Sequence, residues 1–175
     1  MKLNIHDKGA SITHLLIVTG CRRGEIMGLK WEKVDFENSR VKIDRALVSS
    51  KSKGVFEEST KTSDIRYLSL PRETMDLLRQ HKREQLRLQL LNGDRWIHTG
   101  YVFTPDNGDR MNPDSITGWL KDFSARHNLP HINPHAFRHK EIKKSKSYRD
   151  DIFVLDILRE EMAGDDPRIQ RILFE

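Results

Sequence analysis

Three separated stretches of this 175-residue chain hold side chains suited to chemistry on a phosphate. In the first, TGCRR, Arg22 and Arg23 follow the apolar run 15–18 and precede a second apolar stretch. At least one of the two arginines therefore lies close to a core. An arginine fixed at a packed helix start presents a rigid fork of donors for a phosphate. From the residues alone, a surface arginine that pairs with Glu25 remains an equal alternative.

The second stretch places Lys61 at a bend before a predicted strand. Ile65 and Tyr67 in that strand are predicted to pack inward, with Leu68 as a further inward candidate. A lysine at a turn tip can reach a bound polyanion and donate a proton to it. The alternative is an ordinary solvated turn lysine.

The third stretch contains His135 and Arg138, three residues apart on a helix predicted to open at Pro134 with Asn133 as its cap. The two side chains share one face at a helix N-terminus, where backbone N–H groups and the helix dipole favour an anion. An imidazole exchanges protons near neutral pH, whereas a guanidinium keeps its charge. Together they suit a phosphate that undergoes reaction.

A metal site is the rival interpretation of the third stretch, since His131, His135 and His139 are spaced by four residues. Pro134 prevents one regular helix from running through all three histidines. No Asp, Glu or Cys within the segment completes a ligand set. We therefore expect no metal.

Composition favours an anionic partner without identifying it. The chain has 31 Lys+Arg against 26 Asp+Glu, a net charge of +5. Residues 140–175 hold eight Lys/Arg and nine Asp/Glu, a balance of −1, so residues 1–139 carry +6. The single Cys21 excludes an intrachain disulfide and is predicted to be a small buried residue. No apolar run reaches membrane-spanning length and the N-terminus lacks a signal-type segment, so a cytoplasmic protein is expected.

The hydrophobic pattern predicts an α+β chain that is mainly helical, with one small antiparallel sheet. Val34, Phe36, Val41, Ile43, Ala46 and Val48 alternate with polar residues around the turn 37–39, which is typical of a hairpin with one buried face. Tyr67 and Tyr101 are expected to be core residues. The remaining elements are listed by range: a helix over 12–18 capped by Ser11 and ended by Gly20, a helix over 23–29, a helix over 71–91, a strand or turn at 101–103, a turn at 106–109, and helices from Pro113 and Pro134.

These motifs together resemble the catalytic domain of the tyrosine recombinase, or phage integrase, family. Its T-G-x-R-x-x-E box is matched by Thr19–Glu25, followed by Leu29-Lys30-Trp31. Its K-T-x-x-S/D-x-R-x-x-x-L-P hairpin is matched from Lys61 to Pro71, and its H-x-x-R-H box by residues 135–139. The resemblance covers about residues 10–139, with the three motifs in the right order and spacing.

The resemblance implies a helical bundle with a small antiparallel β-sheet on one side, and DNA strand cleavage and rejoining through a 3′-phosphotyrosine. Arg22 and Arg138 would clamp the non-bridging phosphate oxygens. Lys61 would protonate the leaving 5′-oxygen, and His135 would assist proton transfer at the attacking hydroxyl.

The same resemblance implies a supporting role for Glu25 and a structural one for His139. No metal or nucleotide cofactor is implied. The implied partner is double-stranded DNA at an attachment or recombination site, with self-association on DNA and no membrane. The setting would be the cytoplasm of a prokaryotic cell, or a phage-encoded protein.

The C-terminal end departs from the family pattern. After His139 the family continues with an apolar helix, a G-H-x-x-x-x-T box and the nucleophilic tyrosine, whereas residues 140–151 are strongly polar. We therefore expect residues 1–139 to form the integrase-like part and residues 140–175 an atypical tail, which is amphipathic from Ile152 to Met162. Tyr148 lies on the same short segment as Arg138, too close to reach the phosphate that Arg138 holds. The nucleophile stays unassigned.

Two classes of function remain open. The first is a site-specific recombinase domain that is truncated, or whose nucleophile is lost, displaced or supplied by another chain. The second is a non-catalytic DNA-binding remnant of an integrase. A weaker third class is a metal-dependent hydrolase.

Overall fold

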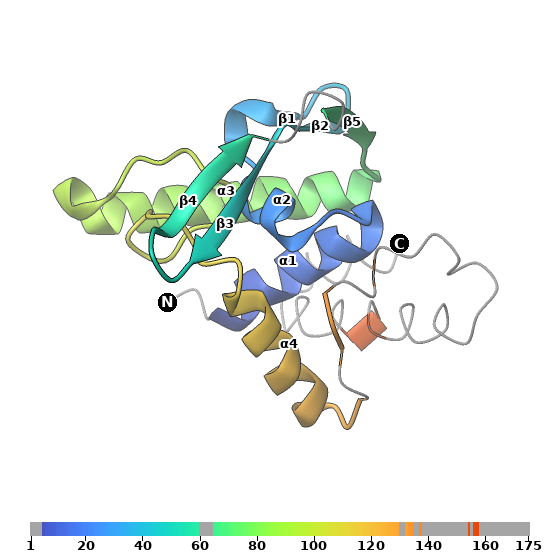
Figure 1. Cartoon of the computed structure of the whole chain (residues 1–175). Helices are drawn as coiled ribbons and strands as arrows, with labels where there is room; N and C mark the ends of the chain where they lie inside the picture. The colour runs from blue at the N-terminus through green and yellow to red at the C-terminus, as the bar shows by residue number, and fades with distance from the viewer. Residues whose placement is uncertain are drawn as a thin grey trace. The chain divides into compact units, whose positions relative to one another are not determined.

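The computed structural model describes residues 5–59, 65–129, 132–134, 137, 154 and 156–157. It divides the chain into two compact units, one of residues 1–22 with 116–175 and the other of residues 23–115. All strands in the described ranges belong to the second unit (Figure 1). The fold is mainly helical with small antiparallel sheets, as the sequence predicts.

The described part of the first unit is built on α1 (Ile5–Thr19) and α4 (Ser115–Arg126). A Cβ atom at Gly9 would lie 2.3 Å from the Trp119 ring, so the two helices approach where no side chain fits. The Trp119 ring stacks on the Phe123 ring, with 5.0 Å between the ring centroids. The buried apolar side chains of the two helices are Ala10, Ile12, Leu15, Leu16, Ile116, Trp119, Leu120 and Phe123.

The predicted start of the first helix is wrong, because α1 begins at Ile5 and Ser11 lies inside it. Gly9 looks like a helix breaker in the sequence, but its contact with Trp119 requires a glycine there. The predicted end is confirmed. Gly20 has φ +62° and donates its N–H to the Leu16 carbonyl at 2.9 Å, which closes the helix.

The second unit contains both sheets and the longest described helix. In the described ranges, β1, β2 and β5 form a three-stranded antiparallel sheet in the order β1-β2-β5, and β3 pairs with β4 in a second sheet (Figure 1). Val34 pairs with Val41 across the turn 37–39, which confirms the predicted hairpin. The elements are α2 (Arg23–Met27), η1 (Trp31–Lys33), β1 (Val34–Asp35), β2 (Arg40–Ile43), β3 (Arg45–Ser50), β4 (Gly54–Ser59), β5 (Arg66–Ser69), α3 (Arg72–Asn92) and η3 (Gly93–Arg95).

The predicted buried face is correct on β2 and wrong on β3. Val41 and Ile43 are buried, whereas Ala46 and Val48 are half-buried and Leu47 takes the core position. The alternation of buried and exposed positions shifts by one residue between β2 and β3, because the chain leaves one sheet after Ile43 and enters the other at Arg45.

Leu47 belongs to a close contact between β3 and α2. A Cβ atom at Gly24 would lie 2.5 Å from the Leu47 carbonyl oxygen, and one at Gly28 would lie 3.0 Å from the Ala46 Cα. The glycines of α2 and of the turn after it therefore let the hairpin backbone approach the helix.

The prediction that Ile65 and Tyr67 pack inward is also wrong, since they are 43% and 60% exposed. Tyr67 pairs with Lys42 in the β2–β5 register, on the solvent face of the sheet. The Arg40 guanidinium and the Lys42 ammonium lie 5.3 and 6.0 Å from the Tyr67 ring centroid. Cations rather than core side chains cover this ring.

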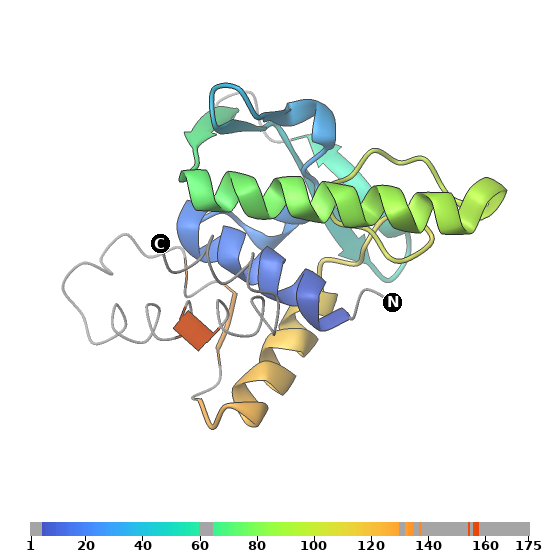
Figure 2. The ribbon, with the colours of Figure 1, turned by 180° about the vertical axis from the view of Figure 1, so that it is seen from behind.

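Helix α3 (Figure 2) spans Arg72–Asn92, in agreement with the predicted helix over 71–91. It positions the segment 101–104. The Nε2 of His81 lies 2.8 Å from the Val102 carbonyl oxygen, and the Gln85 amide donates to the carbonyls of Tyr101 and Val102. Tyr101 is 2% exposed, which confirms its predicted place in the core.

Other predictions are confirmed in part. The turn at 106–109 is present, and the helix predicted from Pro113 begins at Ser115. In the tail, Val154, Asp156 and Ile157 are helical and Val154 is buried. The rest of the predicted tail helix lies outside the described residues, as does most of the helix predicted from Pro134.

Candidate functional site

Arg22 occupies the connection between α1 and α2. Its neighbour Cys21 is fully buried, as predicted, and the Cys21 N–H is bound by the Thr19 hydroxyl oxygen at 3.2 Å. Arg22 itself is exposed and stands directly before the first residue of α2. The backbone on both sides of Arg22 is thus fixed while its side chain faces outward.

Arg23 makes an ion pair with Asp114, 2.7 Å between nitrogen and oxygen. Both side chains are partly exposed, at 33% and 55%. An exposed pair of this kind contributes little to stability.

Glu25 is held by Arg66 in a two-pronged contact. The Glu25 carboxylate oxygens accept hydrogen bonds of 3.2 and 2.8 Å from the two terminal nitrogens of Arg66. The Glu25 side chain is 1% exposed and that of Arg66 is 35% exposed. The paired guanidinium compensates much of the cost of burying the carboxylate. The pairing of Glu25 with a neighbouring surface arginine, left open by the sequence, is replaced here by a partner from β5.

Four predicted site residues lie outside the described residues: Lys61, His135, Arg138 and His139. The same holds for Tyr148 and for His131 of the rival metal interpretation. The chain is described on both sides of Lys61, where β4 ends at Ser59 and β5 begins at Arg66. Of the predicted site, the structure thus describes Arg22 and Glu25.

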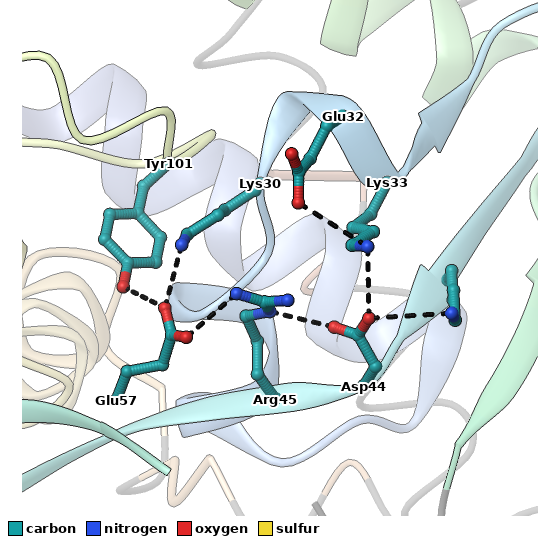
Figure 3. Close-up of polar contacts among 8 residues, drawn as sticks. Lys30, Glu32, Lys33, Asp44, Arg45, Glu57 and Tyr101 are labelled. Carbon is teal, nitrogen blue, oxygen red and sulfur yellow. Dashed lines mark hydrogen bonds and ion pairs between the residues drawn. The ribbon is translucent and has the colours of Figure 1, made fainter. Parts of the chain in front are cut away.

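A carboxylate on β4 gathers three donors that sequence reasoning missed. The Glu57 carboxylate accepts hydrogen bonds from the Tyr101 hydroxyl at 2.6 Å and from Arg45 at 2.8 Å, and the Lys30 ammonium lies 3.0 Å away (Figure 3). Burial alone would raise the pKa of Glu57, but these contacts outweigh it and lower that pKa. Burial, and then the bond to Glu57, raise the pKa of Tyr101 to about 12.

Asp44 extends the same cluster toward β2. It lies 2.9 Å from Arg45, 3.4 Å from Lys33 and 3.7 Å from Lys42 (Figure 3). Burial alone would raise the pKa of Asp44, and the contacts with Arg45 and Lys33 instead hold it below its ordinary value. Clusters of this kind leave a weak sequence signal, because Glu57 and Tyr101 are 44 positions apart.

The described residues contain no group of three or more His, Cys, Asp or Glu arranged to hold a metal ion. Within the same part of the chain, no helix is long and apolar enough to cross a membrane.

Curated relatives match about 70% of the chain. A XerC-like tyrosine recombinase of Caldanaerobacter subterraneus subsp. tengcongensis is 29% identical over 133 residues, which cover 69% of this chain and 34% of the relative. The transposase from transposon Tn916 of Enterococcus faecalis is 27% identical over 135 residues, which cover 71% and 32%. The chain thus spans about a third of the length of the curated relatives it matches.

Solved structures show the same fold. The Tn1549 transposon integrase in complex with circular intermediate DNA aligns with a TM-score of 0.63 at 18% identity, over 98% of this chain and 59% of that one. The same integrase with transposon right end DNA gives 0.60 at 21% identity, over 94% and 53%. The XerA recombinase gives 0.55 at 14% identity, over 100% and 59%.

A family model adds to these likenesses. The model described as the phage integrase family matches residues 2–142, a range that includes Arg22, Glu25, Lys61, His135 and Arg138. The chain therefore belongs to the phage integrase family.

Proposed function

We propose that this chain is the catalytic domain of a site-specific DNA recombinase that breaks and rejoins double-stranded DNA through a phosphotyrosine intermediate. The observation that carries the proposal is the arrangement around Arg22. This arginine is exposed directly before α2, while Glu25, three residues later, is buried against Arg66. An exposed guanidinium on a fixed backbone suits a phosphate ligand. Two of the relatives, a XerC-like tyrosine recombinase and a transposase, agree with this proposal.

In the proposed reaction, a tyrosine oxygen attacks the scissile phosphorus and the 5′-oxygen leaves. Arg22 and Arg138 hold the non-bridging oxygens, whose negative charge grows in the transition state. Lys61 donates the proton that the leaving oxygen takes up, and His135 handles the proton of the attacking hydroxyl. Attack by a 5′-hydroxyl on the phosphotyrosine reverses the step and rejoins the strand.

The remaining parts of the proposal concern support and partners. Glu25 supports the site through Arg66, and His139 has a structural role. Residues 1–139 form the integrase-like part and residues 140–175 a divergent tail. The phosphotyrosine conserves the energy of the phosphodiester, so the reaction requires no metal or nucleotide. The partner is double-stranded DNA, on which copies of the chain associate in the cytoplasm.

A second candidate, a DNA-binding remnant that cuts nothing, is favoured by the tyrosines. Two tyrosines lie in the described residues. Tyr101 is buried and donates to Glu57, and its pKa of about 12 opposes ionisation. Tyr67 is exposed on β5, and the cations of Arg40 and Lys42 lie over its ring. Its neighbour Arg66 forms the pair with Glu25. The environment of Tyr101 is thus not that of an activated nucleophile, and Tyr148 lies outside the described residues.

The two candidates are separated by a covalent-capture experiment. The protein is mixed with nicked duplexes that carry candidate attachment sequences, denatured, and run on a gel that resolves protein-bound DNA. A band that disappears in Arg22→Met and persists in Arg87→Met supports the recombinase domain, because the exposed Arg87 pairs with Glu84 within α3, outside the three motifs. Tyr148→Phe then tests whether that residue is the nucleophile.

The other outcomes are equally decisive. Salt-sensitive DNA retention without a covalent band, lost in Arg22→Met, supports the binding remnant. Failure to retain any duplex at low salt contradicts both candidates.

A further inference from the structure

The second half of α3 carries apolar side chains that face solvent. Within the described ranges, six large apolar side chains are exposed, and four of them lie between positions 86 and 97: Leu86, Leu90, Leu91 and Ile97. Leu90 is 84% exposed and Leu86 is 50% exposed. A helix turns by about 100° per residue, so Leu86 and Leu90 lie about 40° apart on one stripe, while Leu91 lies about 100° from Leu90. Exposed apolar side chains that gather on one stripe mark an interaction surface.

A pocket of about 260 Å³ opens beside this stripe, within the second unit of the chain. Leu86 lines the pocket from α3, and Ile97 lines it from the loop after the helix. The lining also includes three aromatic residues: Trp31, Trp96 and Tyr101. Leu86 and Ile97 thus belong both to the exposed apolar side chains and to the pocket. The apolar stripe therefore continues into a concave site that can receive a side chain.

Contacts between α3 and the following loop form the pocket before any partner binds. The Asn92 side-chain amide at the end of α3 donates to the Asp106 carbonyl at 2.9 Å, and the backbone N–H of Ile97 donates to the carbonyl of residue 107 at 2.8 Å. A Cβ atom at Gly108 would lie 2.5 Å from the Trp96 ring, so the loop backbone lies directly against that ring. Figure 2 shows the loop returning along the end of α3. A preformed pocket lowers the entropy cost of binding.

Two polar side chains that line the pocket, Gln85 and Thr99, use their hydrogen bonds within the chain. Gln85 accepts a hydrogen bond from the Trp31 indole at 2.6 Å and donates to the Thr104 hydroxyl at 3.0 Å. The Thr99 hydroxyl donates to the Gly108 carbonyl at 2.7 Å. An apolar side chain can therefore fill the pocket without leaving these groups unpaired.

The charges beside the stripe favour an acidic partner. Residues 80–97 contain four Lys/Arg and two Asp/Glu, a balance of +2. Arg83 is exposed, about 60° from Leu86 and about 20° from Leu90 around α3. It forms no ion pair within the part of the chain that the structure describes. An exposed guanidinium beside an apolar stripe is complementary to a helix that carries acidic side chains next to its apolar ones.

We propose that Leu86, Leu90, Ile97 and the adjoining pocket, which we call the α3 patch, dock an acidic amphipathic helix of another protein. An apolar side chain of that helix enters the pocket, and acidic side chains beside it pair with Arg83. The proposal goes beyond DNA recombination and requires no residue of the DNA site. A lipid surface fits less well, because Trp96 is only 9% exposed in the lining of a concave pocket and offers little of its ring to a bilayer.

The test is fluorescence anisotropy with a labelled synthetic helix of about 18 residues. The peptide is built from Leu, Glu and Ala, with the Leu and Glu side chains on adjacent stripes. Two comparison peptides replace every Glu by Lys or every Leu by Ala. The parent protein should bind the Leu/Glu peptide at least about tenfold more tightly than either comparison peptide, because each of these lacks one of the two complementary stripes.

Two variants of the protein are each matched by a control on the same helix. Leu90→Glu places a charge on the apolar stripe, and Leu91→Glu makes the same change at the neighbouring leucine, which is 65% exposed. Arg83→Glu reverses the charge beside the stripe. Its control, Arg72→Glu, changes a side chain that is 94% exposed and lies about 16 Å away along α3.

Leu90→Glu should lower the affinity for the Leu/Glu peptide at least about tenfold, and Arg83→Glu about fivefold, while both controls stay within about twofold of the parent protein. Arg83→Glu should also bind the Leu/Lys peptide about fivefold more tightly than the parent does, because the new carboxylate attracts lysine. Circular dichroism checks the fold of each variant. Should Leu90→Glu unfold, Leu90→Gln replaces it.

Three results overturn the proposal. The first is no binding of the Leu/Glu peptide at about 1 mM. The second is an equal loss of affinity in Leu90→Glu and Leu91→Glu. The third is a different occupant of the patch, seen as a dimer in analytical ultracentrifugation or as retention on phosphatidylglycerol vesicles that Leu90→Glu abolishes. Covalent capture of DNA is a separate readout, so failure here leaves the recombinase proposal to its own test.

Discussion

Glu25 and Arg66, 41 positions apart in the sequence, are joined by two hydrogen bonds of 3.2 and 2.8 Å. The pair links α2 to the first residue of β5. Two motifs that are separate in the sequence, the one with Arg22 and the one with Lys61, therefore meet through their neighbours. A buried carboxylate with a paired guanidinium is strongly directional, which suits a site where groups must keep a fixed geometry.

Arg66→Met is expected to lower the free energy of unfolding by about 1–3 kcal/mol, because Glu25 loses both of these donors while its carboxylate stays buried. The value is below that of a fully buried pair, since the Arg66 side chain is 35% exposed. Urea unfolding measures the change. Arg87→Met, which breaks the exposed pair with Glu84 at 3.9 Å on α3, should shift the free energy by less than about 0.5 kcal/mol. Equal losses in the two variants would contradict the importance given to the Glu25 pair.

Stability should decrease in acid through Glu57 and Asp44. The folded state lowers the pKa of both carboxyls below their ordinary values of 4.5 and 3.8. Their contribution is therefore fully present above about pH 4.5 and is lost as the pH falls through the folded-state values. Urea unfolding at a series of pH values from neutral to about pH 3 should show this loss. Glu57→Gln should make the acid slope shallower, and an unchanged slope would exclude Glu57 as a source of it.

Two glycine-to-alanine substitutions should change the free energy of unfolding differently. Gly24→Ala places a Cβ atom 2.5 Å from the Leu47 carbonyl oxygen and should destabilise the fold by about 1–3 kcal/mol. Gly118→Ala lies in α4 with no atom within 4 Å of the added carbon, so it should be neutral or stabilise by up to about 1 kcal/mol. Thermal unfolding of the two variants in parallel checks the comparison. A harmless Gly24→Ala would contradict the close contact between α2 and β3.

Local signals in the sequence predicted the elements well where turn chemistry marked their ends. Pro71 and Gly93 bound α3, Gly20 ends α1, and the turn 37–39 connects β1 to β2. Each of these depends on residues close together in the chain, which a single sequence displays directly.

Long-range contacts explain the errors. Gly9 continues α1 because of Trp119, about 110 positions later, and no local pattern shows that contact. Tyr67 has the residue type of a core position, yet it faces solvent because cations of β2 cover its ring.

The residues of the candidate site likewise fall into two groups, those that a local motif identifies and those that only long-range contacts identify. The motifs with Arg22, Lys61, His135 and Arg138 are visible as residue types at fixed spacing. Arg66 belongs to the motif that runs from Lys61 to Pro71, but nothing local identifies it as the partner of Glu25. No local pattern identifies Glu57 either, because its partners Lys30, Arg45 and Tyr101 come from three different parts of the chain.

The central claim, that Arg22 holds a DNA phosphate, is tested most directly by the salt dependence of duplex binding in Arg22→Met and Arg87→Met. Loss of one phosphate contact should weaken binding about tenfold and reduce the slope of log affinity against log salt by about one in Arg22→Met. Arg87→Met should match the parent protein in both quantities. An Arg22→Met variant that binds duplex DNA with the parent's affinity and salt slope would contradict the account.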